Sequence, residues 1–165
     1  MKKTFFLFTI TGILLSSCGN NHNGHEHAAT GPHTSTTSQL STDGIILLNA
    51  GDDMRFDQTE IRVKEGQTIE LTLRHTGKFP KSSMGHNFVL LKSDASVETF
   101  ANNALAAKET DYVPAGNSDV IAHTRLIGGG ESDVIKFPAP AKGSYPFLCS
   151  FPGHAGIMRG NLIVE

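Results

Sequence analysis

The sequence predicts an all-β domain, a two-sheet sandwich that spans residues 44–165. Short runs rich in β-branched and aromatic residues recur along it, bounded by Gly, Pro, Asp or Asn, which is typical of strands. Alternation is clearest in 67–73, where Ile69, Leu71 and Leu73 would share one buried face. Strands joined by turn residues favour a sandwich. The predicted strands are 45–48, 60–63, 68–73, 87–91, 134–137, 145–149 and 161–164.

One segment departs from the strand pattern. Between residues 93 and 108, Ala and Leu recur at a spacing compatible with a helix, and Ser93 and Ser96 are of a type that caps helix N-termini. We therefore expect a helical insertion near 93–108, between two strands of the sandwich.

The N-terminus is typical of an export signal, which we place at residues 1–17. Two lysines precede a short apolar run, 5–15, which is too short to span a bilayer. The segment 15–18 resembles a bacterial lipobox, so Cys18 is a predicted lipidation site that would anchor the chain to a membrane. The alternative is an ordinary signal that leaves Cys18 as a free thiol. Either way, we expect export to the bacterial periplasm or cell envelope.

Residues 18–43 are rich in Asn, His, Gly, Ser and Thr, with almost no apolar side chains. Such a segment cannot bury enough surface to offset the entropy lost on ordering, so we interpret it as a flexible tether. Its histidines either are solvated or form a tract that captures metal. They are His22, His25, His27 and His33.

Charge, length and cysteine count limit the classes of function that the chain could have. A formal net charge of −2 and a pI near 6.4 give no electrostatic footprint for nucleic acid. The 165 residues predict one domain, expected to be monomeric. If Cys18 carries lipid, Cys149 is the one remaining thiol and cannot form an internal disulfide. Metal ligation is one reason for such a thiol to persist in an oxidising compartment.

The segment 149–158 carries the chemistry. It places Cys149, His154 and Met158 in one loop after a predicted strand, with a Pro-Gly pair that permits a tight turn. His86, at the start of another strand, is the best candidate for a second imidazole. Taken singly, each residue is more typical of core or surface. Together they match the donor set of a blue-copper site, with zinc as the main competing metal.

Four separate motifs lie in the segments 84–87, 120–124, 126–128 and 149–158. In this order they resemble azurin, a family of bacterial cupredoxins, and the likeness extends from residue 45 to the C-terminus. The resemblance implies a Greek-key β-sandwich of about eight strands and one type 1 copper that transfers single electrons. It also implies a weak axial Met158, a fifth contact from the Gly85 carbonyl, and backbone N–H groups of Asn87 and Phe151 directed at Cys149.

The sequence also departs from the azurin pattern. Gly66 stands where the family has a disulfide cysteine, so this domain must be stable without that link. His75 aligns with a histidine linked to pH-dependent behaviour, but Thr76 replaces the Pro that follows it, so we infer no pH switch. We expect His75 and His123 to be packing or surface residues and not ligands.

Apolar residues around the predicted site match, or conservatively replace, a docking patch of the azurin family. Core packing is the alternative for each of them, but an exposed cluster would mark a surface at which a redox partner reaches the His154 ring. By resemblance, such partners would be c-type cytochromes or copper reductases. The predicted rim comprises Met54, Phe79, Met84, Phe151, Pro152 and Ile157.

These features predict an exported, lipid-anchored electron carrier that is not an enzyme. The alternative is a copper-binding protein for storage or delivery, with the histidine tract as the entry point for metal. A hydrolase that uses the Cys149 thiol is disfavoured, because the sequence supplies no oxyanion site or orienting partner for it.

Overall fold

The computed structural model describes residue 41 and residues 43–165. The predicted export signal, the lipidation site Cys18 and the tether histidines lie outside the described residues. Within the part that is described, no helix has the length and apolar character needed to cross a membrane.

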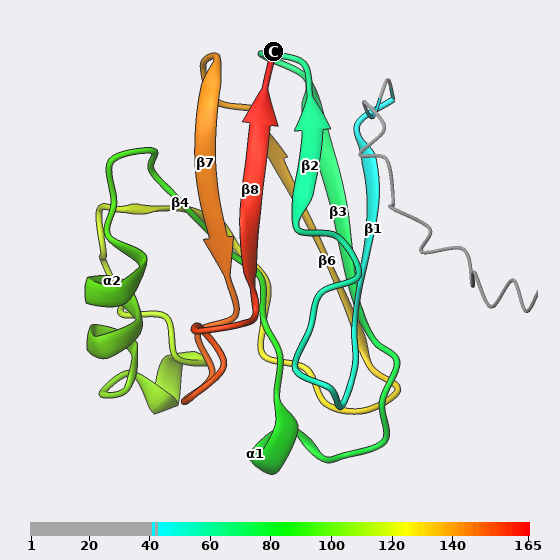
Figure 1. Ribbon diagram of the computed structural model, residues 1–165, viewed down its shortest axis with the longest axis vertical. Coiled ribbons are helices and arrows are strands. Elements are labelled where there is room, and N and C mark those ends of the chain that lie inside the picture. Colours follow the sequence, from blue (N-terminus) through cyan, green and yellow to red (C-terminus); the bar gives the residue numbers. More distant parts are fainter. Residues whose placement is uncertain (1–40, 42) are drawn as a thin grey trace, which may run out of the picture. The chain divides into compact units, whose positions relative to one another are not determined.

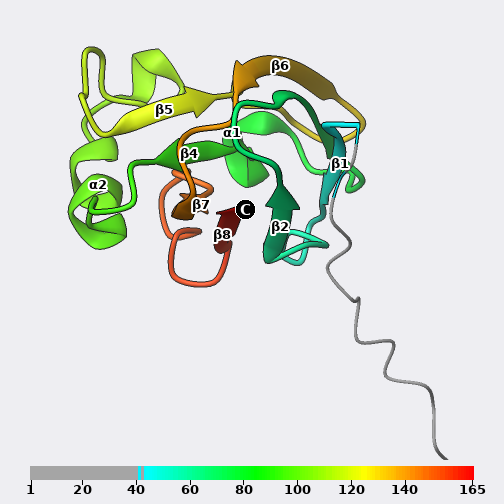
Figure 2. The same ribbon diagram turned by 90° about the horizontal axis from the view of Figure 1, so that it is seen from above.

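Two β-sheets form the domain (Figures 1 and 2). The smaller sheet has the strand order β1-β3-β6, with β1 parallel to β3 and β6 antiparallel to it. The larger sheet has the order β2-β8-β7-β4-β5, in which the β2–β8 pair is parallel and the others are antiparallel. The strands are β1 Ile45–Ala50, β2 Glu60–Val63, β3 Thr68–His75, β4 Val89–Leu91, β5 Val120–His123, β6 Ser132–Pro138, β7 Gly143–Leu148 and β8 Arg159–Val164.

The eight described strands confirm the predicted sandwich, and β5 is the strand that the residue pattern did not reveal. It lies at the edge of its sheet and pairs with β4 alone. Its first three residues are half-buried and the fourth is exposed, so they lack the alternation that a strand with one buried face shows.

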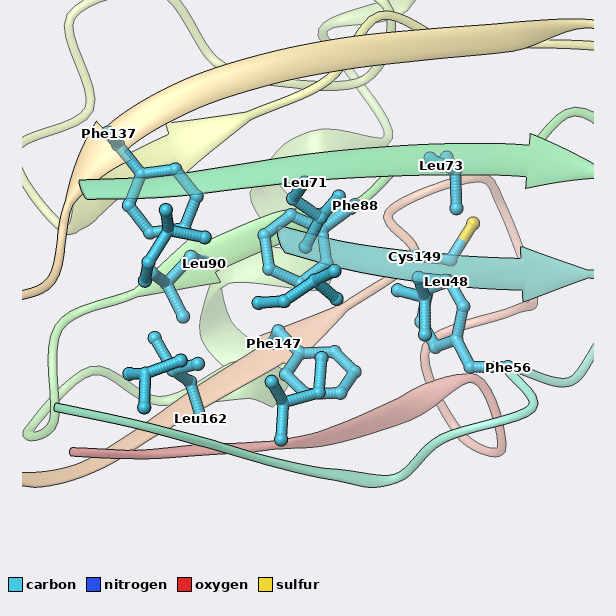
Figure 3. Close-up of a cluster of buried hydrophobic side chains, with 14 of the residues drawn as sticks. Leu48, Phe56, Leu71, Leu73, Phe88, Leu90, Phe137, Phe147, Cys149 and Leu162 are labelled. Atoms are coloured by element: carbon cyan, nitrogen blue, oxygen red, sulfur yellow. The ribbon is translucent and has the colours of Figure 1, made fainter. Parts of the chain in front are cut away.

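The core lies between the two sheets (Figure 3). Ile69, Leu71 and Leu73 are each 0% exposed, which confirms the face predicted for β3. Phe88 packs against Phe147, with ring centroids 5.2 Å apart. The close-up shows the Cys149 side chain at one end of this apolar cluster, near Leu48 and Leu73. The core therefore continues directly into the region that carries the candidate donors.

The helical insertion is present but shorter than predicted. Helix α2 spans Val97–Ala104, and the Ser96 hydroxyl caps it by accepting a hydrogen bond from Thr99 N (3.1 Å). A short 3₁₀ turn, η1 (Lys108–Thr110), follows. The helix buries Phe100 and Ala104 in a second apolar cluster beside β4 and β7. Its apolar face thus supports the strands that lead to the candidate site.

A second helix, α1 (Lys81–Met84), was not expected from the sequence. It is a single turn with no buried residue, and it lies just before His86. Its formation is local, because Met84 N donates to Pro80 O (3.0 Å) and Pro at the preceding position is compatible with a helix start.

Side chains cover the outer edge of β1, where unpaired backbone groups would otherwise invite another strand. Gln58 Nε2 donates to Leu47 O (2.8 Å), and Asn49 N donates to Asp57 Oδ1 (2.8 Å). Ser41 Oγ donates to Ile45 O (3.2 Å). These bonds occupy the edge and disfavour association of two copies through it.

Adjacent leucines of β1 test the assignment of the core. Leu48 is 0% exposed and Leu47 is 44% exposed. We expect Leu48→Ala to lower the free energy of unfolding by about 2–5 kcal/mol, because it leaves a cavity in the core. The same substitution at Leu47 should change it by only about 0.5 kcal/mol. Urea unfolding of the metal-free protein measures both, and equal losses would contradict the assignment.

Candidate metal centre

The candidate donors come from two loops at the end of the sandwich opposite the C-terminus (Figure 1). One is the segment 149–158 between β7 and β8, and the other leads from α1 into β4. The loop after β1 lies beside them, since Gly51 O is within hydrogen-bond distance of the His86 ring. The two sheets thus hold fixed the ends of every segment that contributes to the site.

Hydrogen bonds close the 149–158 loop on itself. Cys149 N donates to Met158 O (2.9 Å), and Met158 N donates to His154 O (2.8 Å). His154 N donates to Phe151 O (3.0 Å), which makes a tight turn with Gly153 at φ 85°. This left-handed conformation favours glycine, as the Pro-Gly pair predicted. Strand β7 ends at Leu148, so Cys149 belongs to the loop and not to the strand predicted over 145–149.

The structure brings together the thiol and the two imidazoles that the sequence singled out. Cys149 Sγ lies 3.7 Å from His154 Nδ1 and 4.0 Å from His86 Nδ1, and the three donor atoms are all within 4.8 Å of one another. Bonds of about 2.0 Å to nitrogen and 2.3 Å to sulfur in a trigonal plane would separate sulfur from nitrogen by about 3.7 Å. The spacing therefore suits one metal ion between the three atoms.

The two remaining predicted donors belong to the two loops that carry the trio. Met158 is 0% exposed and belongs to the same buried cluster as Cys149. Gly85 O lies 3.9 Å from Cys149 Sγ, next to His86 in the chain. The structure thus places the Gly85 carbonyl near the sulfur and Met158 in the loop that carries Cys149 and His154, while axial ligation by Met158 stays a prediction.

The His86 ring is held by its surroundings in the tautomer that a metal requires. Nε2–H donates to Gly51 O (2.8 Å), which leaves the Nδ1 lone pair facing Cys149. The backbone of His86 exchanges two hydrogen bonds with Ile127, of 2.9 and 2.8 Å. The ring of His75, only 1% exposed, stacks on that of His86 with centroids 4.4 Å apart. His75 is therefore a packing residue, in line with the sequence analysis.

Asn87 ties the two donor loops together. Its Nδ2 donates to Ser150 Oγ (2.8 Å) and to Asp111 O (2.8 Å). Ser150 N donates back to Asn87 Oδ1 (2.8 Å). Asp111 has a left-handed backbone, φ 56°, an uncommon conformation for a residue other than glycine. The side chain of Asn87 thus fixes the residue after His86 to the residue after Cys149.

Burial sets the protonation states of the donors. It raises the pKa of the Cys149 thiol to about 11, although the backbone N–H groups of Asn87 and Phe151 oppose this by bonding to the sulfur. Burial, followed by the charges of His86 and His75, lowers the pKa of His154 to about 4. The pKa of His86 is also lowered, chiefly by burial. At neutral pH the metal-free site thus holds a thiol and two neutral imidazoles.

This donor set fits copper. A thiolate and two imidazoles with a soft thioether nearby are typical of the trigonal sites that hold a single copper ion. Burial of the donors also fits a copper site, since Cys149, His86 and Met158 are each 0% exposed. The two backbone N–H groups directed at the sulfur would stabilise thiolate charge once a cation replaces the proton.

His154 is the donor closest to solvent, although only 3% of it is exposed. The predicted docking role of the His154 ring edge suggested a larger exposed fraction. The fraction is small because Phe151 covers one side of the ring, at 4.7 Å between centroids. Tyr112 packs edge-on against Phe151 at 5.4 Å. Of the predicted rim, Phe79 is 53% and Ile157 46% exposed, Pro152 is exposed, and Met54 and Met84 are half-buried.

Sequence reasoning missed the roles of Gly51 and Tyr112. A backbone carbonyl leaves no side-chain signature, so nothing in the sequence linked Gly51 to a histidine 35 residues away. Tyr112 lies outside the loops that carry the donors and packs against the ring of Phe151. His123, in contrast, is exposed on β5, away from the donor trio, as expected for a surface histidine.

Comparison with known proteins places these observations in a family. A sequence model described as copper binding proteins, plastocyanin/azurin family, matches residues 45–165. Azurin of Bordetella pertussis is 42% identical over 128 residues, which cover 74% of this chain and 85% of that protein. Outer membrane protein H.8 of Neisseria gonorrhoeae is 40% identical over 119 residues, which cover 70% of this chain but only 64% of its own length.

Solved structures of similar fold agree with the family that the sequence comparisons indicate. Auracyanin A from Chloroflexus aurantiacus, described as a blue copper protein, superposes with a TM-score of 0.68 at 34% identity, covering 73% of this chain and 98% of its own. An azurin from Methylomonas sp. strain J gives 0.68 at 36% identity, covering 73% and 97%. The match over the whole β-domain confirms the cupredoxin sandwich and the copper assignment made from the sequence. The chain therefore belongs to the plastocyanin/azurin family of copper-binding proteins.

Proposed function

We propose that this chain carries single electrons on one type 1 copper held by Cys149, His86 and His154. Met158 supplies a weak axial thioether, and the Gly85 carbonyl supplies a fifth contact. The observation that carries the proposal is the convergence of one thiol and two imidazole Nδ1 atoms within 4.8 Å, inside a copper-binding family. The trio contains no carboxylate, which favours a metal that prefers soft donors.

The residues of the site suit fast electron exchange. Bound copper supplies a couple between Cu(I) and Cu(II). His86 is fixed by Gly51 and by its stacking on His75, while Asn87 locks its loop to that of Cys149. Donors held this way need little rearrangement when the charge at the site changes. Their burial leaves no open position for a substrate, which favours electron transfer over enzymatic chemistry.

Electrons would enter and leave through His154. Of the three predicted ligands, His154 is the one that keeps some exposure, 3% of the residue, whereas Cys149 and His86 are 0% exposed. The rim around it would form a small, short-lived interface with a partner. We assign this docking role to Met54, Phe79, Met84, Pro152 and Ile157, and by family resemblance the partners are c-type cytochromes or copper reductases.

The chain would act at a membrane surface of the bacterial periplasm or cell envelope, as a monomer. Its N-terminal pattern supports lipidation of Cys18, and the tether over 18–43 would let the domain swing between partners. Similarity to an outer membrane protein of Neisseria supports an envelope location. Storage or delivery of copper is disfavoured, because delivery needs ligand exchange and the three predicted ligands are buried.

Replacement of the thiol tests the function directly. We expect the purified protein with Cu(II) to show an intense visible thiolate-to-copper band, and Cys149→Ser to lose it, because serine supplies no thiolate. Cys18→Ser removes the other cysteine and should keep the band. Absorption and electron paramagnetic resonance spectra measure both, and a colourless wild-type protein that prefers zinc would refute the proposal.

Replacement of the thioether tests the axial assignment. Met158→Leu keeps the volume and apolar character but removes the donor, so Cu(II) loses some stabilisation relative to Cu(I). We expect the visible band to persist and the reduction potential to rise, as measured by redox titration. Met84→Leu, at a half-buried rim position, is the control and should leave the potential unchanged. A Met158→Leu variant with the wild-type potential would argue against axial ligation.

Copper uptake should release about one proton at pH 7. The pKa of Cys149 is raised to about 11, so its thiol must lose a proton, whereas the pKa of His154 is lowered to about 4 and its ring is already neutral. Calorimetry in buffers of different ionisation enthalpy counts the protons. Release near zero would show that the thiol is already ionised in the metal-free protein.

The lowered pKa of His154 also predicts how the stability of the metal-free protein responds to acid. The folded state holds His154 neutral down to about pH 4, whereas the unfolded chain takes up this proton near the ordinary value of 6.5. Between these limits the unfolded state binds more protons, so the free energy of unfolding should fall as the pH is lowered from 6.5 to 4. Urea unfolding at several pH values checks this, and His154→Gln should flatten the slope.

A further inference from the structure

Asp52 lies beside the metal centre without belonging to the donor set. It directly follows Gly51, whose carbonyl accepts the hydrogen bond from His86 Nε2. Its carboxylate accepts two backbone hydrogen bonds from a different segment, from Lys78 N to Oδ2 (2.8 Å) and from Phe79 N to Oδ1 (3.3 Å). Asp52 therefore joins the loop after β1 to the segment between β3 and α1.

The carboxylate occupies a space that only a glycine leaves open. A Cβ added to Gly77 would collide with the Asp52 carboxylate, so a side chain at Gly77 would displace it. Gly77 N donates to His75 Nδ1 (3.0 Å), and His75 Nε2–H donates to Met84 O (2.8 Å). The turn that Asp52 holds is thus the one that orients the His75 ring.

These contacts reach His86 by two routes. Along one, Asp52 holds the loop that carries Gly51, whose carbonyl fixes the edge of the His86 ring. Along the other, it holds the turn that orients His75, whose ring covers the face of His86 at 4.4 Å between centroids. Both supports of the His86 ring therefore belong to segments that the Asp52 carboxylate joins.

The charge of Asp52 acts at the same place. Its side chain is 28% exposed, and Oδ1 lies 4.0 Å from His75 Nε2. The backbone N–H of Lys78 is the largest cause that lowers the pKa of Asp52, so the group is ionised at neutral pH. A fixed negative charge near His86 favours the more positive oxidation state of a metal bound there.

We propose that Asp52 is a positioning residue of the copper site, which holds the His86 ring through Gly51 and His75 and lowers the reduction potential by its charge. The proposal rests on the copper function proposed above. It assigns a role to a residue that contributes no donor atom, and it requires Gly77 as the partner that leaves room for the carboxylate.

Asp53 supplies a matched control. It is the adjacent residue, it is exposed, and it makes no hydrogen bond or ion pair within the described residues. Asp52→Asn and Asp53→Asn remove the same charge one position apart, and both nearly preserve the side-chain shape. Differences between the two variants therefore report the contacts of Asp52 and not the net charge of the protein.

The first measurement uses the metal-free protein and does not depend on copper. Amide hydrogen exchange at Lys78 and Phe79 should accelerate about tenfold or more in Asp52→Asn, because the charge-assisted bonds from these amides are weakened. Asp53→Asn should leave both rates unchanged. Unchanged exchange in Asp52→Asn would overturn the positioning role.

The second measurement is made on the copper-loaded protein. Asp52→Asn should raise the reduction potential more than Asp53→Asn does, and copper should dissociate about tenfold faster, which is the low end of effects for residues that support ligands. Equal shifts of potential in the two variants would overturn the proposal. If wild-type protein forms no blue site, the copper function fails, while the exchange rates still decide whether Asp52 anchors the turn.

A charge-preserving variant covers the case in which Asp52→Asn does not fold. Asp52→Glu keeps the negative charge but adds a methylene, and the space beside Gly77 is already filled by the shorter Asp52 side chain. We expect faster exchange at Lys78 and Phe79 together with a smaller change of potential than in Asp52→Asn. Wild-type exchange rates in Asp52→Glu would show that the fit against Gly77 is not required.

Discussion

The site depends on burial of the Cys149 sulfur at the end of the hydrophobic core. A buried thiol resists ionisation, and the pKa of Cys149 is raised to about 11 for this reason. Two backbone N–H groups directed at the sulfur partly offset the cost of burying a thiolate. The metal-free site is thus neutral, and a bound cation supplies the charge that makes the thiolate stable. The buried sulfur and the N–H groups directed at it therefore form one place in the fold where a bound cation stabilises the thiolate.

Around that sulfur, the imidazoles are positioned mainly by the backbone. Gly51 O fixes the tautomer of His86, Ile127 pairs with its main chain, and the tight turn at Gly153 brings His154 back towards Cys149. The loops themselves are held at both ends by strands whose apolar faces are fully buried. Because the donors are already 3.7 and 4.0 Å from the sulfur, little of the site must be built when metal arrives.

The same packing limits access to the metal. Only 3% of His154 is exposed, because the tilted ring of Phe151 covers one side of it and Tyr112 packs edge-on against Phe151. In the proposed role, an electron would cross this barrier, whereas a substrate molecule or a competing ligand would be kept from the metal. The exposed part of the rim, at Phe79 and Ile157, is apolar, which suits a transient contact with a protein. The donors are therefore shielded from exchanging ligands, and the surface at which a partner would dock is apolar.

The sequence alone determined the fold class, most strand positions, the helical insertion and the donor types. Alternation in 67–73 predicted the buried face of β3, since period-two patterning follows from strand geometry. The donors of the 149–158 loop were visible because they are close together in the chain. His86 lies in a separate segment, and its place at the start of a predicted apolar strand made it the best candidate before the family resemblance supported it. The roles of the predicted export signal and tether remain predictions.

Tertiary structure decided what no local pattern encodes. The Gly51 carbonyl, the stacking of His75 and the carboxylate of Asp52 act on His86 from segments that are distant in the chain or carry no chemical signature. Edge strand β5 also emerged only in three dimensions, because its pairing with β4 defines it. The residues of the metal site were thus readable from the sequence, but their orientation depends on contacts that form only when the two sheets close.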